Sequence, residues 1–153
     1  MPLAKFIEEM KKTILLHAVA AHFSNGVIPV AVLYLLLALP ARDPFFEHTV
    51  KHLLVIVLIA APVSFLTGIL EWKTKYKGAK APVFTTKIRL SFVLFALCLI
   101  AVTIRFSVPD VMNGSGILFW VYTVSLLVML PVVVLLGHYG GKLSSGQRQE
   151  KFR

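Results

Sequence analysis

Five histidines are the residues of this apolar chain best able to do chemistry. They are His17, His22, His48, His52 and His138. A neutral imidazole can ligate haem iron, bind other metals or relay a proton. Because ionisable groups at membrane depth are costly, they usually face a bundle interior, a cavity or a cofactor. The lone Cys98 excludes internal disulfides, cysteine-based zinc sites and covalent c-type haem attachment, which leaves the imidazoles as the candidate ligands.

His22 and His138 are predicted to be the axial ligands of one b-type haem. Bundles build cofactor sites from side chains on facing helices. The first and last apolar spans run in opposite directions, which brings His22 and His138 to the same membrane face. Gly26 lies one turn beyond His22, and its missing side chain would admit the porphyrin. His17 could pair with His138 in place of His22, but the two lie about 140° apart around the helix and cannot face one haem equally. One of them is therefore expected to support the site, contact a quinone or lie at the interface.

Two basic residues begin the third span on the same side as the predicted haem. Lys87 and Arg89 could each donate charge-assisted hydrogen bonds to the porphyrin propionates. The alternative is that both side chains extend to the membrane surface without a ligand.

His48 and His52 open the second span, on the opposite side of the membrane. Their i,i+4 spacing puts them close to one helix face. They lack the intervening glutamate of a His-Glu-x-x-His zinc motif, and no third ligand is evident. Three interpretations stay open: interfacial residues, contacts to a quinone carbonyl, or ligands of a second haem that another chain completes.

The elements that must position these residues are membrane helices. The chain is 58% hydrophobic and 15% charged, whereas soluble domains are about 45–50% apolar and about 25% charged. The pattern predicts an all-α bundle of four transmembrane helices in one integral membrane domain, residues 1–153. The four spans are expected at about 14–39, 50–70, 86–106 and 117–138. The net charge of +9 comes from bases that flank the spans, which indicates membrane lipid rather than nucleic acid as the partner.

The distribution of basic residues predicts that both termini are cytoplasmic. Three bases (Arg42, Lys51 and Arg105) lie on one side, and thirteen on the other: Lys5, Lys11, Lys12, Lys73, Lys75, Lys77, Lys80, Lys87, Arg89, Lys142, Arg148, Lys151 and Arg153. By the positive-inside rule, the richer side faces the cytoplasm of a bacterial inner membrane. The basic loop Lys73–Lys80 either sets this topology and touches anionic lipid, or docks an acidic soluble partner.

Two clusters of small and polar residues interrupt the first two spans. They are Ser24, Asn25, Gly26 and Pro29 in the first span, and Pro62, Ser64, Thr67 and Gly68 in the second. Proline kinks can open room for a cofactor between helices, whereas small residues alone allow close helix packing. We expect a cavity, with close packing as the alternative.

Three short motifs resemble a widespread family of short four-helix bacterial inner-membrane proteins. His17-Ala-Val-Ala-Ala-His22-Phe23 is similar to its paired-histidine first helix, Gly68-Ile69-Leu70-Glu71-Trp72 to its Gly-x-x-Asp-Trp, and Gly137-His138-Tyr139-Gly140-Gly141-Lys142-Leu143 to its closing Gly-Gly-x-Leu. Ser24 stands where the family has proline, and Lys87–Arg89 where it has a histidine. The resemblance, which extends to small b-type cytochrome membrane subunits, implies a four-helix fold with a redox or haem-binding role.

These observations predict an electron-transfer subunit of a larger oxidoreductase complex rather than a stand-alone enzyme. It would carry electrons between the quinone pool and other redox subunits or a soluble electron-transfer protein. Haem b is the expected cofactor, and quinone is a further possible ligand. The chain could also form homo-oligomers. The alternative is a haem-free structural anchor of a respiratory complex. A small transporter or proton channel ranks last, because proton relays commonly use Asp or Glu and the predicted spans of this chain contain almost none.

Overall fold

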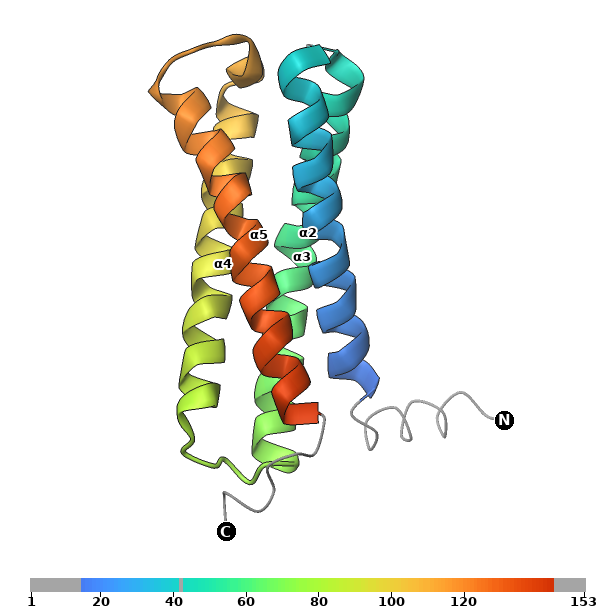
Figure 1. Cartoon of the computed structure of the whole chain (residues 1–153), viewed down its shortest axis with the longest axis vertical. Helices are drawn as coiled ribbons and strands as arrows, with labels where there is room; N and C mark the ends of the chain where they lie inside the picture. Colours follow the sequence, from blue (N-terminus) through green and yellow to red (C-terminus); the bar gives the residue numbers. More distant parts are fainter. Residues whose placement is uncertain (1–14, 42, 145–153) are drawn as a thin grey trace, which may run out of the picture.

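The computed structural model describes residues 15–41 and 43–144, and these fold into four long helices and one short one. The long helices are α2 (Leu15–Ala41), α3 (Pro44–Thr74), α4 (Pro82–Ser107) and α5 (Ile117–Ser144), and the 3-10 helix η1 covers Val111–Asn113. Each long helix runs antiparallel to the next, in an up-and-down bundle (Figure 1). The predicted all-α four-helix bundle is confirmed.

All four long helices are long and apolar enough to cross a membrane, so the chain is a multi-pass membrane protein. Helix α4 begins four residues before the expected third span, because Pro82 takes the first helical turn, where a missing N–H costs nothing. Helix α3 begins in the same way at Pro44, and Asp43 accepts a hydrogen bond from the amide of Phe45 (2.8 Å).

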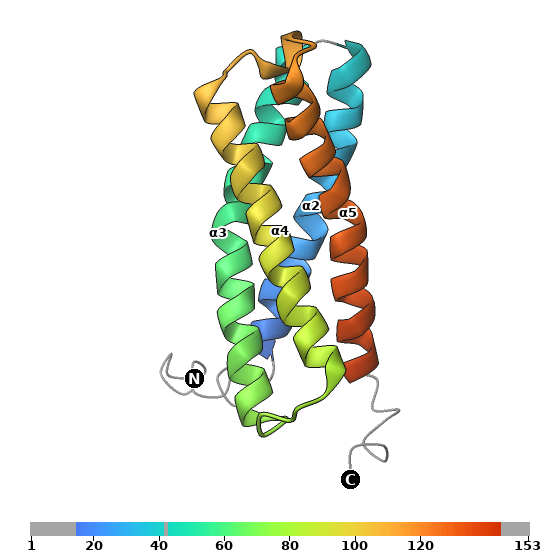
Figure 2. The same ribbon diagram turned by 90° about the vertical axis from the view of Figure 1, so that its left-hand side faces the viewer.

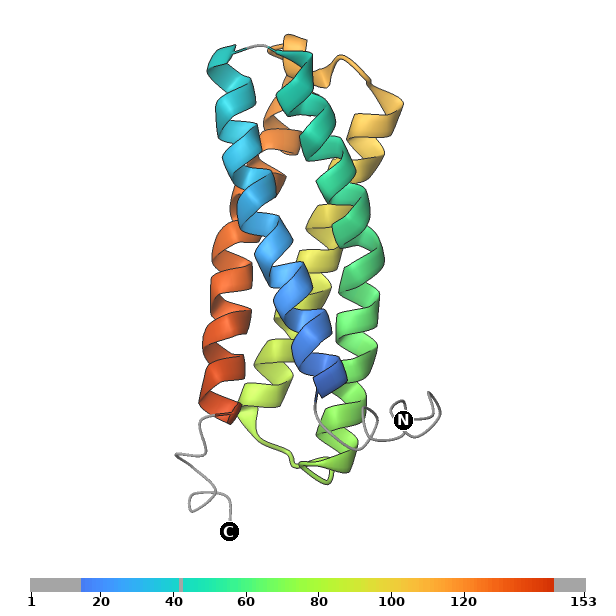
Figure 3. The same ribbon diagram turned by 90° about the vertical axis from the view of Figure 1, so that its right-hand side faces the viewer.

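Both described ends of the chain lie at one end of the bundle, together with the loop between α3 and α4 (Figures 1 and 3). That loop holds Lys75, Lys77 and Lys80, and we call this end the basic end. The loop reverses at Lys77 and Gly78, whose φ angles are 50° and 68°. The other end, which we call the far end, holds the α2–α3 and η1–α5 connections. Lys5, Lys11, Lys12, Arg42, Arg148, Lys151 and Arg153 lie outside the described residues.

Small residues let the helices approach one another closely, as expected where lipid gives no hydrophobic drive to association. Ala31, Ala38, Cys98 and Ala101 are all buried, and the Sγ of Cys98 donates to the Leu54 carbonyl (3.6 Å). Many large apolar side chains point outward, Ile59 and Leu66 among them. Since acyl chains rather than water surround a membrane helix, this apolar exterior fits the transmembrane assignment.

Candidate binding cavity at the basic end

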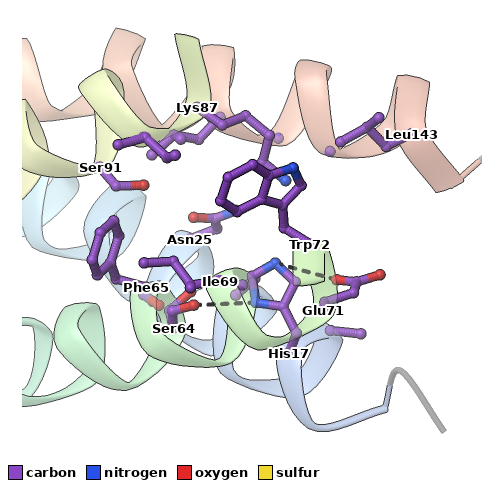
Figure 4. A pocket seen from close by; sticks show the side chains of 18 of the residues that line it. His17, Asn25, Ser64, Phe65, Ile69, Glu71, Trp72, Lys87, Ser91 and Leu143 are labelled. Atoms are coloured by element: carbon purple, nitrogen blue, oxygen red, sulfur yellow. Dashed lines mark hydrogen bonds and ion pairs between the residues drawn. The ribbon is translucent and has the colours of Figure 1, made fainter. Parts of the chain in front are cut away.

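A cavity of about 350 Å³ opens between the four long helices at the basic end. Its volume is at the lower end of the range of about 300–1,000 Å³ that is typical of ligand pockets. Every long helix contributes to its wall, and the polar side chains in Figure 4 converge on it. The cavity that the small and polar clusters of the first two spans predict is therefore present, with Asn25, Ser64 and Gly68 in its lining.

His17 is the histidine that packs most closely into this cavity. Its Nδ1 lies 3.1 Å from the Ser64 carbonyl and 3.2 Å from the Thr67 hydroxyl. Because a carbonyl can only accept, Nδ1 carries the proton and Nε2 has the lone pair when the ring is neutral. The ring packs on Gly68, where a Cβ would stand 2.9 Å from the His17 Cε1. Helix α3 thus fixes the orientation of an imidazole that α2 provides.

Two charged side chains join His17 in the cavity wall. The Nε2 of His17 is 3.8 Å from a carboxylate oxygen of Glu71, and the other Glu71 oxygen is 3.8 Å from the Lys75 Nζ. Lys87 reaches in from α4, and Glu71 interacts electrostatically with both His17 and Lys87. The base, the acid and the cation come from α2, α3 and α4, so only the folded bundle brings them together.

Aromatic side chains close the basic end of the cavity. The indole of Trp72 donates to the Ala79 carbonyl (3.0 Å), and the Tyr76 hydroxyl donates to the Leu143 carbonyl (3.3 Å). The ring of Phe84 lies 6.0 Å from that of Trp72 and 5.1 Å from that of Tyr76. These contacts hold the basic loop against α5 and make the three aromatic side chains a wall of the cavity.

His22 borders the cavity, whereas Gly26 does not. The His22 ring is exposed, and its Nδ1–H donates to the Ala18 carbonyl one turn earlier (2.7 Å). Gly26 is exposed as well, and a Cβ built on it would meet nothing within 4 Å. Open space beside Gly26 is compatible with a flat ligand on the outside of α2, but not with one inside the cavity.

The structure does not bring His138 to the cavity. It stands nine residues after the buried Met129, which at 3.6 residues per turn is about 180° around α5. Its exposed ring contacts Tyr139, with ring centroids 5.6 Å apart, and its helix neighbours Gly137 and Gly140 line the cavity in its place. His138 therefore does not line the cavity that His22 borders, and the haem with these two axial ligands stays a prediction.

The two basic residues at the start of α4 occupy different positions. Lys87 lines the cavity, and its Nζ is 3.9 Å from where a Cβ would stand on Gly140 of α5. Arg89 is exposed and outside the cavity wall. The surface position predicted as one alternative thus describes Arg89 but not Lys87.

His48 and His52 are exposed at the far end. The Nδ1–H of His48 donates to the Pro44 carbonyl (2.8 Å). Within residues 15–41 and 43–144, no group of three or more His, Cys, Asp or Glu side chains is arranged to hold a metal ion.

A buried ion pair at the far end was not predicted from the sequence. The Nη2 of Arg105 is 2.9 Å from the Glu47 carboxylate, with side chains 5% and 13% exposed, and the Arg105 Nη1 donates to the Pro109 carbonyl. The pair ties α3 to the end of α4. The one feature of the sequence that indicates this pair is that two opposite charges lie close to span ends on the same predicted side of the membrane.

Comparison with known proteins finds one relative of note. The chain is 30% identical over 93 residues to an uncharacterized protein of Archaeoglobus fulgidus, an alignment that covers 60% of this chain and 72% of the relative. No protein-family model matches the chain. No solved structure matches it.

Proposed function

We propose that this chain, which belongs to the same family as the uncharacterized Archaeoglobus fulgidus protein, binds a membrane quinone in its basic-end cavity. It would do so as a small subunit of an electron-transfer complex. The observation that carries the proposal is the cavity itself, whose base, acid and cation (His17, Glu71 and Lys87) gather at one end of an apolar bundle. An amphiphile with a polar ring is the ligand class that suits this distribution.

The chemistry of the three groups matches the two carbonyl oxygens of a quinone. The Lys87 ammonium is a hydrogen-bond donor only, and protonated His17 is a donor at Nε2. Reduction to the quinol takes two electrons from a partner redox protein and two protons. His17 and Glu71, 3.8 Å apart, can hold and pass protons between the ring and the basic end. In the reverse direction, the Nε2 lone pair of neutral His17 can accept a proton from the quinol.

The resemblance to short bacterial four-helix proteins supports the same site. Its three motifs lie on α2, α3 and α5, yet residues from each of them line the one cavity: His17 and His22; Gly68, Ile69, Glu71 and Trp72; and Gly137, Gly140, Gly141 and Leu143. Residues that are distant along the chain thus meet where the proposed ligand binds. In this proposal the chain lies in a bacterial inner membrane with the basic end in the cytoplasm, by the positive-inside rule. The basic loop would then meet the redox partner or anionic lipid.

The proposal for this cavity does not include haem b, which stays a separate prediction. His22 has the hydrogen-bonding pattern of a metal ligand, since its Nδ1–H is held by a carbonyl. The predicted second axial ligand, His138, does not line this cavity, so such a haem would lie outside the cavity or in an assembly with another chain. Haem binding stays a prediction for such an assembly, and a Soret band from the purified protein would be its sign.

Fluorescence quenching of Trp72 tests the proposal. The protein has two tryptophans, Trp72 in the cavity wall and the exposed Trp120 near the far end. We expect the ubiquinone head group to quench a Trp120→Phe variant saturably, because a quinone in the cavity lies against the one indole that remains.

A Trp72→Phe variant is the matched control, since it keeps only the distant indole. It should show weak quenching that rises linearly with quinone concentration. Equal, unsaturated quenching of both variants would overturn the quinone proposal and favour a purely structural membrane anchor.

A further inference from the structure

A second, smaller hollow lies between α3 and α4, about halfway along the bundle. Its volume is about 160 Å³, and its lining is Ala61, Pro62, Phe65, Ser91, Phe92 and Phe95. We call it the α3–α4 crevice. Phe92 is 59% exposed, so the crevice reaches the outer, lipid-facing surface of the bundle. Figure 2 shows α3 and α4 side by side on this face.

The crevice and the basic-end cavity share part of their walls. Ala61, Phe65 and Ser91 line both. Two of these three side chains are small, which leaves room where the hollows meet, and in Figure 4 Phe65 and Ser91 lie at the cavity side away from Glu71. Phe65 and Phe92 form a tilted pair with ring centroids 5.1 Å apart. A ligand could therefore extend from the cavity to the lipid without crossing a packed layer of large side chains.

Polarity changes along this path in the order an amphiphile needs. Glu71 and Ala61 are ten residues apart on α3, which at 1.5 Å per residue is about 15 Å along the helix axis. The charged groups lie at the basic end of that distance. The crevice end is lined by aromatic rings, a proline and small residues. A polar ring at His17 and Lys87 would thus continue into an apolar chain at the crevice.

We infer that the α3–α4 crevice holds the apolar tail of the ligand whose polar ring occupies the basic-end cavity, and that this ligand enters sideways from the membrane. The inference rests on the proposed quinone site and narrows its ligand class to tailed membrane quinones. Pro62 contributes to the opening, because proline cannot donate the helix hydrogen bond and its ring displaces the preceding turn.

Two quinones that have the same ring but differ in the tail distinguish tail binding from head-group binding. The tail-less ubiquinone head group and decylubiquinone are titrated against the Trp120→Phe protein, with and without Ser91→Leu, in the same detergent, with Trp72 quenching as the readout. The decyl tail also partitions into detergent micelles. This partitioning is the same for both proteins, so it cancels when the affinity ratio of the two quinones is compared between them. We expect Ser91→Leu, which fills the junction, to lower the preference for the tailed quinone about tenfold.

Phe92→Ala provides a second test, because it removes an exposed wall of the crevice without adding bulk to the interior. It should also reduce the preference for the tailed quinone. Leu99→Ala on the same helix, exposed to lipid and outside the crevice, should leave that preference unchanged.

The outcomes distinguish the crevice from the quinone site. An unchanged preference in both crevice variants, with the head group still bound, overturns the tail path and leaves the quinone site standing. If decylubiquinone alone binds and depends on Ser91, the crevice stands while the assignment of the ring to the cavity fails. If neither quinone binds wild type, both inferences fail.

Discussion

Arg105→Met is expected to destabilise the folded bundle by about 3–5 kcal/mol, the typical cost of removing one member of a buried ion pair. Arg105 is 4% exposed and contacts both Glu47 and the Pro109 carbonyl. Without it, the Glu47 carboxylate stays at the far end with no cation within contact distance among the described residues. The connection from α4 to η1 also loses the hydrogen bond that Arg105 donates to Pro109.

Thermal unfolding in detergent measures this effect, with two further variants to identify its cause. Arg89→Met removes an exposed arginine from the same helix and should cost little. The double variant Glu47→Leu/Arg105→Met removes both charges and should recover much of the loss, because no unpaired charge remains. A single variant as stable as Arg89→Met would show that the far-end pair contributes little to the fold.

Lys87→Met should weaken quinone binding about 10- to 100-fold. A hydrogen bond from a charged donor contributes about 1.5–3 kcal/mol, and about 1.4 kcal/mol corresponds to tenfold in affinity. Methionine keeps the apolar stem of the side chain along the cavity wall and removes only the ammonium group. The fold should therefore persist while one of the two proposed carbonyl contacts is lost.

Trp72 quenching by the ubiquinone head group measures that affinity, with Arg89→Met as the matched control. Both variants remove one positive charge from the start of α4, but only Lys87 lines the cavity. If the two variants weaken binding equally, long-range attraction rather than a cavity contact is responsible. If neither does, Lys87 is not a ligand contact.

The fold could be predicted from the sequence because four long apolar runs with breakers between them admit few other structures. Individual histidines were harder, because a helix can be rotated about its axis without any change in its hydropathy. His22 and His138 share a membrane depth, but depth does not fix the direction of a side chain. Only the packing of α5, with Met129 inward, turns His138 outward.

The cavity was partly predictable and its charged groups mostly were not. The cluster from Pro62 to Gly68 indicated space beside α3, and Ser64 and Gly68 do line the cavity. Glu71 and Lys87, however, look like ordinary span-end charges in the sequence. Their meeting with His17 depends on the register of α2, α3 and α4 against one another, which side-chain packing decides.

Photolabelling with an azido-substituted quinone, followed by peptide mapping, tests the quinone site most directly. We expect competitor-sensitive labels on the cavity-facing positions of several helices: His17 and Ala21 on α2, Gly68, Glu71 and Trp72 on α3, and Lys87, Ile88 and Ser91 on α4. Labels spread over the lipid-facing positions, such as Ile59 and Leu135, and insensitive to excess unlabelled quinone would contradict binding in the basic-end cavity.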